Sequence, residues 1–413
     1  MLNGSYEPIM RSVRLGFFVV LPLLVPGPSP AETSVQRSTT PPVRAEESAA
    51  ARPPSHAVGL GKQLSTADGG QIFGFDINQN GDDGVLASSQ TVTSGGELLV
   101  SVETFDQNSG KITKSFAKYE GLRNSYGVDG IFMGDVALIT HYVEPKGSIY
   151  ALRHYDVMNP VTAKKFTGEW RVPVKDTDVL LTAENQTTPT AVMFGIELKN
   201  QDQPDLIVSD VATNKSRAFH LDPNLFGLGN GPQLGQYTAA NEAVFALSPD
   251  GGRVGGAAPV NILVNLTTGG QTQFNGLNEG PFGSGYVNGL AVDPNTGIAA
   301  TTTELNAQVE FYDLTKETGT AVQLPCTGDT SQGNSGAGIT VDPINHLFLV
   351  TDPFYCNGSD GSAIIVYDES GNFVEAITGL KFFIGEPPAA INPSKRMGWT
   401  FGPGFNNLQQ FFY

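Results

Sequence analysis

Cysteine and charged residues are both scarce in this chain. Two cysteines in 413 residues exclude a disulfide-dense scaffold and a multi-cysteine zinc module. Only 16% of the residues are charged, and acidic residues outnumber basic ones, so the formal net charge is −17. Because a strongly acidic chain repels phosphate groups, we expect neither nucleic acid nor an anionic membrane surface as a partner.

The recognisable motifs of several enzyme classes are missing. The sequence holds no nucleophile elbow, P-loop, dinucleotide fingerprint or HExxH string. No two of its five histidines form a pair at metal-binding spacing: His56, His141, His154, His220 and His346. Without a complete catalytic motif, the first functional hypothesis is a binding module whose loops contact a protein, glycan or small-molecule ligand.

Long hydrophobic runs are also lacking. The apolar segment 15–25 (LGFFVVLPLLV) is shorter than the roughly 20 residues of a membrane-spanning helix, and Pro22 interrupts it. Basic residues precede it and small residues follow it, as in a secretory signal peptide over 1–31, with Met10 as an alternative start. We therefore predict a secreted, periplasmic or extracellular protein that has no membrane span after cleavage. An uncleaved anchor, as in an envelope-associated structural protein, is the alternative.

The segment after the signal peptide differs from the rest of the chain. Residues 32–56 are rich in proline, alanine, serine, threonine and arginine, which predicts a disordered tether. Residues 57–413 are assigned to one folded domain, which we expect to be a monomer. In an exported chain, two cysteines favour a disulfide between Cys326 and Cys356, with two buried free thiols as the alternative.

Glycine (49 residues) and proline (27 residues) are abundant, as a fold with many tight turns requires. Turn clusters divide the segment 337–380 into four short strands, predicted at 338–341, 346–351, 362–367 and 372–377. The first strand begins with small residues and the last is the most polar. This trend indicates an antiparallel unit with one strand near a crowded axis and one at an outer edge.

The first strand and turn of this unit recur along the chain. NGLAVDP at 288–294 matches AGITVDP at 337–343 at an offset of 49 residues, and Asn392 continues the series 50 residues after Asp342. FALSP at 245–249 is interpreted as the preceding copy. A four-stranded repeat of this length predicts an all-β fold, a β-propeller of about seven blades, although six or eight also agree with the pattern. Earlier blades are expected at 73–119, 129–156 and 190–221.

The two ends of the domain predict how the ring closes. Strands are expected at 389–392, 397–401 and 408–413, which is one strand short of a blade. The first ordered segment after the tether, 57–64, would supply the fourth. Joining both termini in one blade removes free sheet edges and stabilises the ring.

Strings near the C-terminus carry a family resemblance. These are NGLAVDP and AGITVDP, FLVTD ending at Asp352, and GEPP at 385–388 ahead of MGWT at 397–400. With them the chain resembles the broad group of NHL-repeat and SMP-30/gluconolactonase-like propellers. The lactonase-like members hold a divalent cation, usually calcium, at the axis of the ring.

The resemblance implies a set of calcium ligands. The matching positions are Glu386, Asn288 and Asp352, and Asp129 opens its blade in the same register as Asn288. Oxygen ligands from several inner strands suit calcium, and such an ion would polarise a lactone or ester carbonyl. The implied activity is a calcium-dependent lactone or ester hydrolase. The alternative is that these side chains serve turns.

A second calcium candidate lies in the loop DINQNGDDG. Asp76, Asn78, Asn80 and Asp82 follow the spacing that opens a calcium loop, but Ala87 stands where an EF-hand needs a bidentate glutamate. A shorter calcium loop and a polar hairpin loop are equally compatible with this string.

Aromatic residues in predicted loops are candidates for a ligand face. They are Tyr286, Phe354 and Tyr355. The alternative is that they pack against the edges of blades, as aromatic side chains usually do.

Overall fold

The computed structural model describes most of the chain from residue 58 to the end. The described ranges are 58–67, 69–92, 97–122, 129–133, 136–143, 152–158, 169–170, 177–183, 190–197, 203–210, 213, 215–226, 232–247, 260–274, 287–303, 308–325, 338–353, 355, 361–381, 389–403 and 406–413, and for parts of several strands only the backbone is described. The predicted signal peptide and tether, and both cysteines, lie outside these ranges, so those predictions stay untested.

The described residues form seven antiparallel sheets of four strands each. The first three are β2–β5, β6–β9 and β10–β13. Their strands are β2 (Gln71–Ile77), β3 (Asp83–Val92), β4 (Glu97–Asp106), β5 (Lys111–Leu122), β6 (Asp129–Met133), β7 (Val136–Val143), β8 (Leu152–Met158), β9 (Glu169–Trp170), β10 (Thr177–Ala183), β11 (Thr190–Glu197), β12 (Pro204–Asp210) and β13 (Lys215–His220).

The next three sheets follow in chain order. Their strands are β14 (Gln233–Tyr237), β15 (Glu242–Leu247), β16 (Val260–Asn265), β17 (Gln271–Phe274), β18 (Val287–Val292), β19 (Ile298–Thr303), β20 (Gln308–Asp313), β21 (Thr318–Gln323), β22 (Gly338–Asp342), β23 (Leu347–Asp352), β24 (Ser362–Asp368) and β25 (Phe373–Leu380). The seventh sheet joins the two ends of the domain: β1 (Gly59–Ser65), β28 (Asn407–Phe412), β27 (Met397–Phe401) and β26 (Ala390–Asn392), with a short 3-10 helix, η3 (Pro393–Lys395), between β26 and β27.

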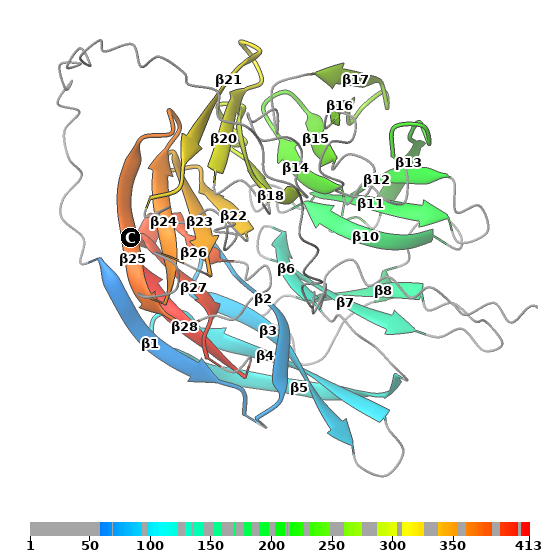
Figure 1. Cartoon of the computed structure of the whole chain (residues 1–413). Coiled ribbons are helices and arrows are strands. Elements are labelled where there is room, and N and C mark those ends of the chain that lie inside the picture. Colours follow the sequence, from blue (N-terminus) through cyan, green and yellow to red (C-terminus); the bar gives the residue numbers. More distant parts are fainter. Residues whose placement is uncertain are drawn as a thin grey trace, which may run out of the picture.

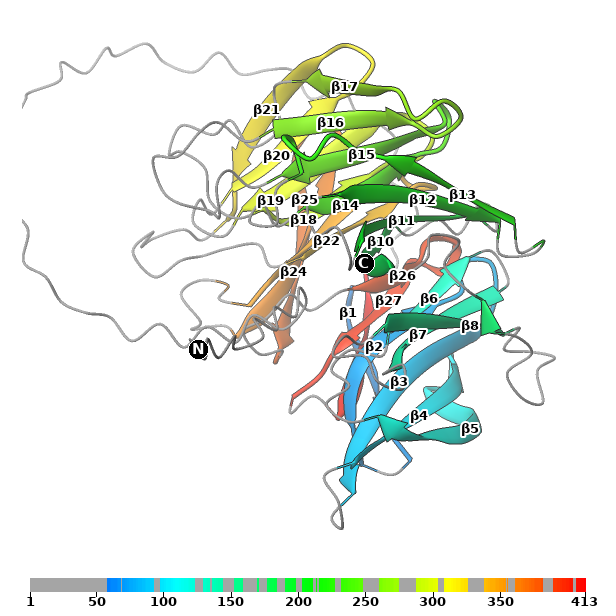
Figure 2. The ribbon, with the colours of Figure 1, turned by 90° about the vertical axis from the view of Figure 1, so that its right-hand side faces the viewer.

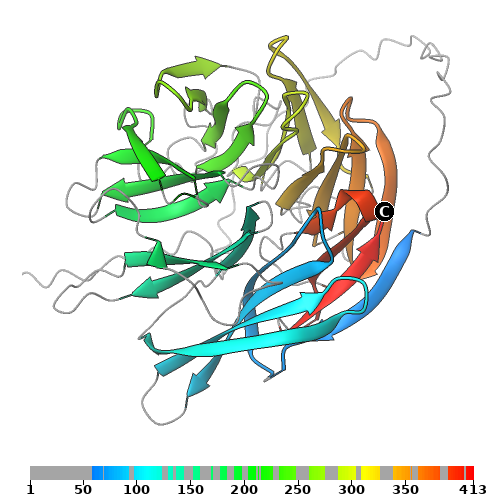
Figure 3. The ribbon, with the colours of Figure 1, turned by 180° about the vertical axis from the view of Figure 1, so that it is seen from behind.

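Consecutive sheets lie side by side around a common axis (Figures 1 and 3). Each innermost strand from β10 to β26 contacts the innermost strand of the next sheet, and β2 contacts both β26 and β6. From the side, the sheets β10–β13, β14–β17 and β18–β21 are stacked face to face (Figure 2). The fold is therefore a β-propeller, as the repeats predict, and its sheets are the blades.

Closure of the ring by both termini is confirmed. β1 pairs with β28 in antiparallel register, from Gly59 opposite Phe412 to Ser65 opposite Asn407 (Figure 1). The closing blade also packs on the first one, since Phe105 meets Trp399 at 5.4 Å and Phe75 meets Phe401 at 5.1 Å between ring centroids. These buried aromatic pairs lie in one hydrophobic cluster that spans the join.

The four strands predicted within 337–380 are those of the sheet β22–β25, whose central strands β23 and β24 are buried and whose outer strand β25 is partly exposed. One prediction is wrong. The interpretation of 245–249 as a copy of the first strand and turn fails, because Phe245 lies in β15, the second strand of its blade, and the first strand is β14. A buried second strand carries the same apolar residues as an inner strand, so composition does not distinguish them.

The antiparallel order gives the propeller two different ends. Connections between the first and second strands and between the third and fourth strands of a blade share one end, here called the capped end. The remaining connections share the opposite end, here called the loop end. In the sheets β2–β5, β14–β17, β18–β21 and β22–β25, and between β26 and β27, the connections at the capped end have four or five residues, whereas in the sheets β6–β9 and β10–β13 they have two to ten. Six connections at the loop end have nine or more residues: 221–232, 248–259, 275–286, 324–337, 353–361 and 381–389.

Candidate functional site

At the capped end, aspartates accept hydrogen bonds within the turns that join the first and second strands of a blade. Oδ1 of Asp293 accepts hydrogen bonds from the backbone N–H groups of Asn295 (2.8 Å) and Thr296 (3.2 Å). Oδ1 of Asp342 accepts from those of Ile344 (3.0 Å) and Asn345 (2.8 Å). The recurring Asp-Pro strings therefore form turns in which the carboxylate accepts backbone N–H groups, here called capped turns.

The capped turns also bond from blade to blade. The carbonyl oxygen of the proline in each turn accepts a hydrogen bond from the turn of the preceding blade. The three bonds are Ala239 N–H to Pro294 O (3.0 Å), Asn295 Nδ2 to Pro343 O (3.3 Å) and Asn345 Nδ2 to Pro393 O (3.2 Å). Much of the polar chemistry at this end is therefore used to hold the ring together.

One inter-blade contact brings a histidine between two carboxylates. Nδ1 of His346 lies 3.0 Å from Oδ2 of Asp293 and 3.3 Å from Oε1 of Glu369. The hydroxyl of Thr296 donates to the same Glu369 oxygen at 2.6 Å. Burial alone would lower the pKa of His346, but the hydrogen bond with Asp293 and the two negative charges raise it overall. Burial and the nearby Asp293 raise the pKa of Glu369. This cluster suits a protonated imidazole that links two blades.

The candidate calcium loop is occupied by protein donors. Oδ1 of Asn78 accepts the backbone N–H of Asn80 at 2.9 Å. The ammonium of Lys395, from the closing blade, pairs with the carboxylate of Asp82. This hydrogen bond, with one from Asn108, holds the pKa of Asp82 below its usual value. Asp76 is buried in β2, whereas the Asp82 side chain is 64% exposed. These contacts are those of the polar hairpin alternative, and calcium binding there stays a prediction.

The axial calcium candidates share the loop end of the propeller. Asp129 is the first residue of β6, Asn288 lies at the start of β18, and Asp352 ends β23. Asp352 is almost fully buried. Glu386 lies outside the described residues, in the connection that leads to β26, and the side chains of Asp129 and Asn288 are not described. The topology thus agrees with a common end, while convergence of the four side chains stays a prediction.

Sequence inspection missed a second histidine–carboxylate cluster, at the loop end of the sheet β10–β13. One ligand-capable atom from each of Glu197, Asp205 and His220 lies within 4.8 Å of the others. Nδ1 of His220 is 2.7 Å from Oδ1 of Asp205. Pairwise histidine spacing could not reveal it, because the three residues come from three strands. The only signal was an acid or histidine at the same end of each strand.

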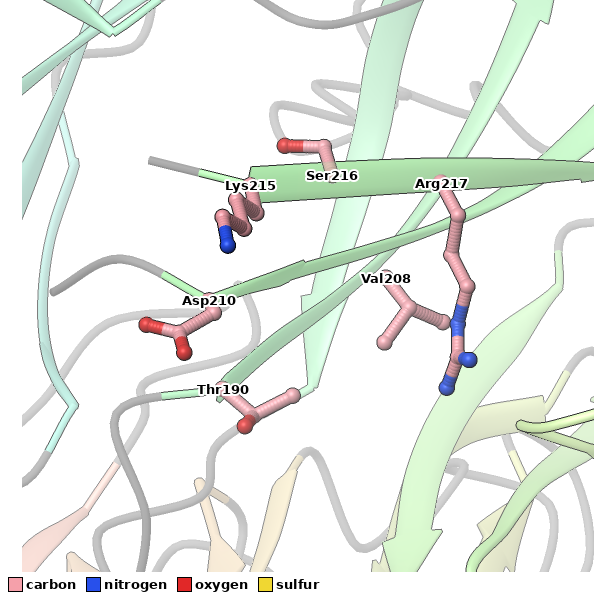
Figure 4. A pocket seen from close by; sticks show the side chains of 6 residues that line it. All are labelled: Thr190, Val208, Asp210, Lys215, Ser216 and Arg217. Atoms are coloured by element: carbon pink, nitrogen blue, oxygen red, sulfur yellow. The ribbon is translucent and has the colours of Figure 1, made fainter. Parts of the chain in front are cut away.

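Two of the hollows in the described part of the chain border the sheets of the middle blades. One of about 280 Å³ lies over the outer strands of the sheet β10–β13 (Figure 4). Lys215 and Arg217 project on one side of β13, whereas Ser216 points away and its hydroxyl bonds to that of Ser209. The other, of about 380 Å³, is lined by residues such as Phe274, Tyr312 and Glu317. The first hollow is lined by the hydroxyl residues Thr190 and Ser216 together with Asp210 and Lys215.

The predicted aromatic ligand face is only partly described. Tyr355 is half-buried and packs against the hydrophobic cluster that contains Phe348 and Val350. This contact agrees with the alternative that Tyr355 packs against a blade. Tyr286 and Phe354 lie outside the described residues, so their role stays a prediction.

The fold and the two ends define the class of this protein: an all-β propeller closed by its own termini. Solved structures share this fold. A chain of the mitotic checkpoint complex aligns over 92% of this chain and 99% of its own length, with 13% identity and a TM-score of 0.54. U3-55K aligns over 85% and 98%, with 11% identity and a TM-score of 0.58, and the WD40 repeats of RRP9 over 86% and 98%, with 10% identity and a TM-score of 0.57.

At these identities the likeness shows the fold alone, and the resemblance to NHL-repeat and SMP-30-like propellers stays a prediction. No protein-family model matches the chain, and no curated protein sequence matches it. Among the described residues, no helix has the length and apolar character needed to span a membrane.

Proposed function

We propose that this protein is a non-catalytic binding module whose loop end docks a partner protein. The observation that carries the proposal is the difference between the two ends. Six connections of nine or more residues leave the loop end between β13 and β26, while capped turns bond from blade to blade at the opposite end. Variable loops on a rigid scaffold are a common basis for recognition.

Charge and structural relatives support a protein partner. The formal net charge of −17 favours a partner with a basic surface, because complementary charge accelerates encounter. One similarly folded chain belongs to the mitotic checkpoint complex.

We further propose that the module acts as a monomer outside the cytoplasm, on the tether 32–56, with a disulfide between Cys326 and Cys356.

The test compares the two ends of the propeller. Partners are captured by crosslinking the purified protein in extract of its source, identified, and then purified for binding measurements. We expect 1:1 binding that falls at least about tenfold when 275–286 or 248–259 is replaced by a four-residue Gly-Ser linker. The control, Lys316→Ala in an exposed capped turn, should bind like the wild type. Binding that is insensitive to both loop replacements, or robust turnover of a small ester by the purified protein, would contradict the proposal.

The second candidate function is the calcium-dependent lactone or ester hydrolase. It is favoured by the placement of Asp129, Asn288 and Asp352 at one end of the ring. We expect calcium, at 100 times its dissociation constant, to stabilise the protein by about 2.7 kcal/mol over an EDTA-treated sample. This gain should vanish in Glu386→Ala. A melting curve that calcium leaves unchanged would rule out the axial site, and a gain that persists in Glu386→Ala would move the ion elsewhere.

A further inference from the structure

We infer that Glu197, Asp205 and His220 form a binding site for a divalent transition metal of the zinc class. The site lies at the loop end of the sheet β10–β13 and is separate from both calcium candidates. It does not depend on the proposed partner.

Strand pairing brings the three side chains to one face of the sheet. Asp205 is directly opposite His220 in the β12–β13 pair, and opposite Gly195 in the β11–β12 pair. Glu197 follows Gly195 by two residues, so its side chain projects on the same face. Since Gly195 has no side chain, it leaves the space beside Asp205 open to Glu197.

Backbone contacts fix the ends of these strands. The N–H of Leu221 donates to the carbonyl of Pro204 at 2.9 Å, and the Gln203 amide bonds to the carbonyls of Pro204 (2.9 Å) and Leu221 (3.2 Å). The N–H of Glu197 donates to the carbonyl of Gln203 at 3.2 Å. These bonds fix the backbone beside Asp205 and His220.

The surroundings of Asp205 also point to a bound cation, independently of the strand geometry. The residue is fully buried, and its Oδ2 atom has no hydrogen-bond partner among the described residues. Its Oδ1 contacts a histidine whose side chain is 70% exposed. A buried carboxylate oxygen without a donor is costly, and a bound cation would remove that cost.

The donor set selects the metal. Two carboxylates and an imidazole are nitrogen and oxygen donors, which suit zinc and its neighbours, whereas calcium takes oxygen ligands only. Ligands about 2.0–2.2 Å from a tetrahedral zinc lie roughly 3.3–3.6 Å apart, so atoms already within 4.8 Å need only small side-chain movements. Three protein ligands, with an exposed histidine on one side, leave a position for water.

The cluster of Asp293, His346 and Glu369 provides a matched comparison within the same chain. It has the same residue types, but both carboxylate oxygens of Asp293 already accept hydrogen bonds, and Oε1 of Glu369 accepts from Thr296. A protonated His346 satisfies this cluster without a metal. We therefore expect zinc to bind the cluster of Glu197, Asp205 and His220.

The test is zinc titration by calorimetry on untagged, full-chain protein at pH 7.5, with cobalt as a spectroscopic probe. We expect one ion per chain and visible cobalt absorption typical of low coordination number. His220→Ala and Asp205→Asn should each weaken binding at least about tenfold, as the loss of a ligand should do at least as much as the loss of a supporting contact. His346→Ala should bind like the wild type.

Folding is checked separately from binding. His220 is largely exposed and Asp205→Asn preserves shape, so both variants should melt like the metal-free wild type. Zinc should raise the melting midpoints of the wild type and of His346→Ala, but not those of the two ligand variants. Absence of zinc binding, binding that persists in His220→Ala, or binding that is lost in His346→Ala would each overturn the inference.

Discussion

Asp342 shows how one side chain organises its surroundings. It is fully buried, and both of its oxygens have donors. Oδ1 accepts two backbone N–H groups in its own turn, and Oδ2 accepts the amide of Asn345 (2.7 Å) and the hydroxyl of Tyr413 (3.0 Å). Burial and the Asp342 charge raise the pKa of Tyr413 well above its ordinary value, so Tyr413 stays a neutral donor. The last residue of the chain is thereby bonded to a neighbouring blade.

The substitution Tyr413→Phe tests this bond. We expect the free energy of unfolding to fall by about 1–2 kcal/mol, because Asp342 keeps its buried charge but loses one donor. Denaturant unfolding of both proteins would measure the difference.

Tyr367→Phe is the matched control. Tyr367 is also buried, but its hydroxyl has no hydrogen-bond partner among the described residues. Removing that hydroxyl should leave stability unchanged within about 0.5 kcal/mol, or raise it. Equal losses in the two variants would mean that the Asp342 bond contributes nothing specific.

At the scale of elements, the turn between β22 and β23 is both a local turn and an inter-blade contact. His346 is its last residue and has a left-handed backbone, with φ of 54°. The equivalent residue of the preceding blade is Gly297, with φ of 76°. A left-handed backbone is less favourable for histidine than for glycine. In this conformation, however, the ring of His346 contacts Asp293 across the blade boundary.

The raised pKa of His346 predicts a pH-dependent contribution to stability. A group whose folded-state pKa is raised stabilises most below its unfolded value, about 6.5, and loses that effect as pH rises through the folded-state pKa. His346→Asn keeps a residue that tolerates the left-handed backbone. We expect a loss of under about 1 kcal/mol at pH 5.5, since the ring is half-exposed, and a smaller loss at pH 8.5.

Urea unfolding at the two pH values would measure this effect. Asn295→Ala removes an uncharged bond at the same boundary, to Pro343, so its cost should not change with pH. A cost of His346→Asn that is the same at both pH values would show that the imidazole is not acting as a cation.

At the scale of the whole molecule, the ring depends on a strand from the far end of the chain. β1 covers the edge of β28, and its Leu64 is buried in the cluster that joins the closing blade to its neighbours. Without β1, the edge of β28 would be open to pairing with another chain. The closing blade is therefore a long-range contact that forms only when both ends of the domain are present.

Circular permutation tests this closure. Gly59 pairs with Phe412, so a short linker from Tyr413 to residue 58 would place 58–65 after β28 as an ordinary hairpin strand. We expect this permutant, beginning at residue 66, to be monomeric on size exclusion and to melt within a few degrees of the unpermuted domain. Deleting 58–65 outright should lower the melting midpoint strongly and cause aggregation. A permutant that fails to fold would show that β1 must enter the blade from the N-terminal side.

The sequence by itself determined the class of fold and its closure. The strands of the sheet β22–β25, the capped Asp-Pro turns and the shared terminal blade all follow from local features: short apolar runs, turn residues and their repetition. Such features act over a few residues, and repetition along the chain makes them visible. The error at 245–249 arose where that local signal is the same for two adjacent strands.

Only the tertiary structure decided which distant side chains meet. His346 lies 53 residues from Asp293, and His220 lies 15 residues from Asp205, yet each pair is in direct contact. Those contacts depend on how blades stack and on which face of a strand each residue occupies. A shift of one residue in strand register moves each side chain to the opposite face of the sheet. Composition therefore predicts the blades, whereas strand register and the packing of blades determine which polar residues meet.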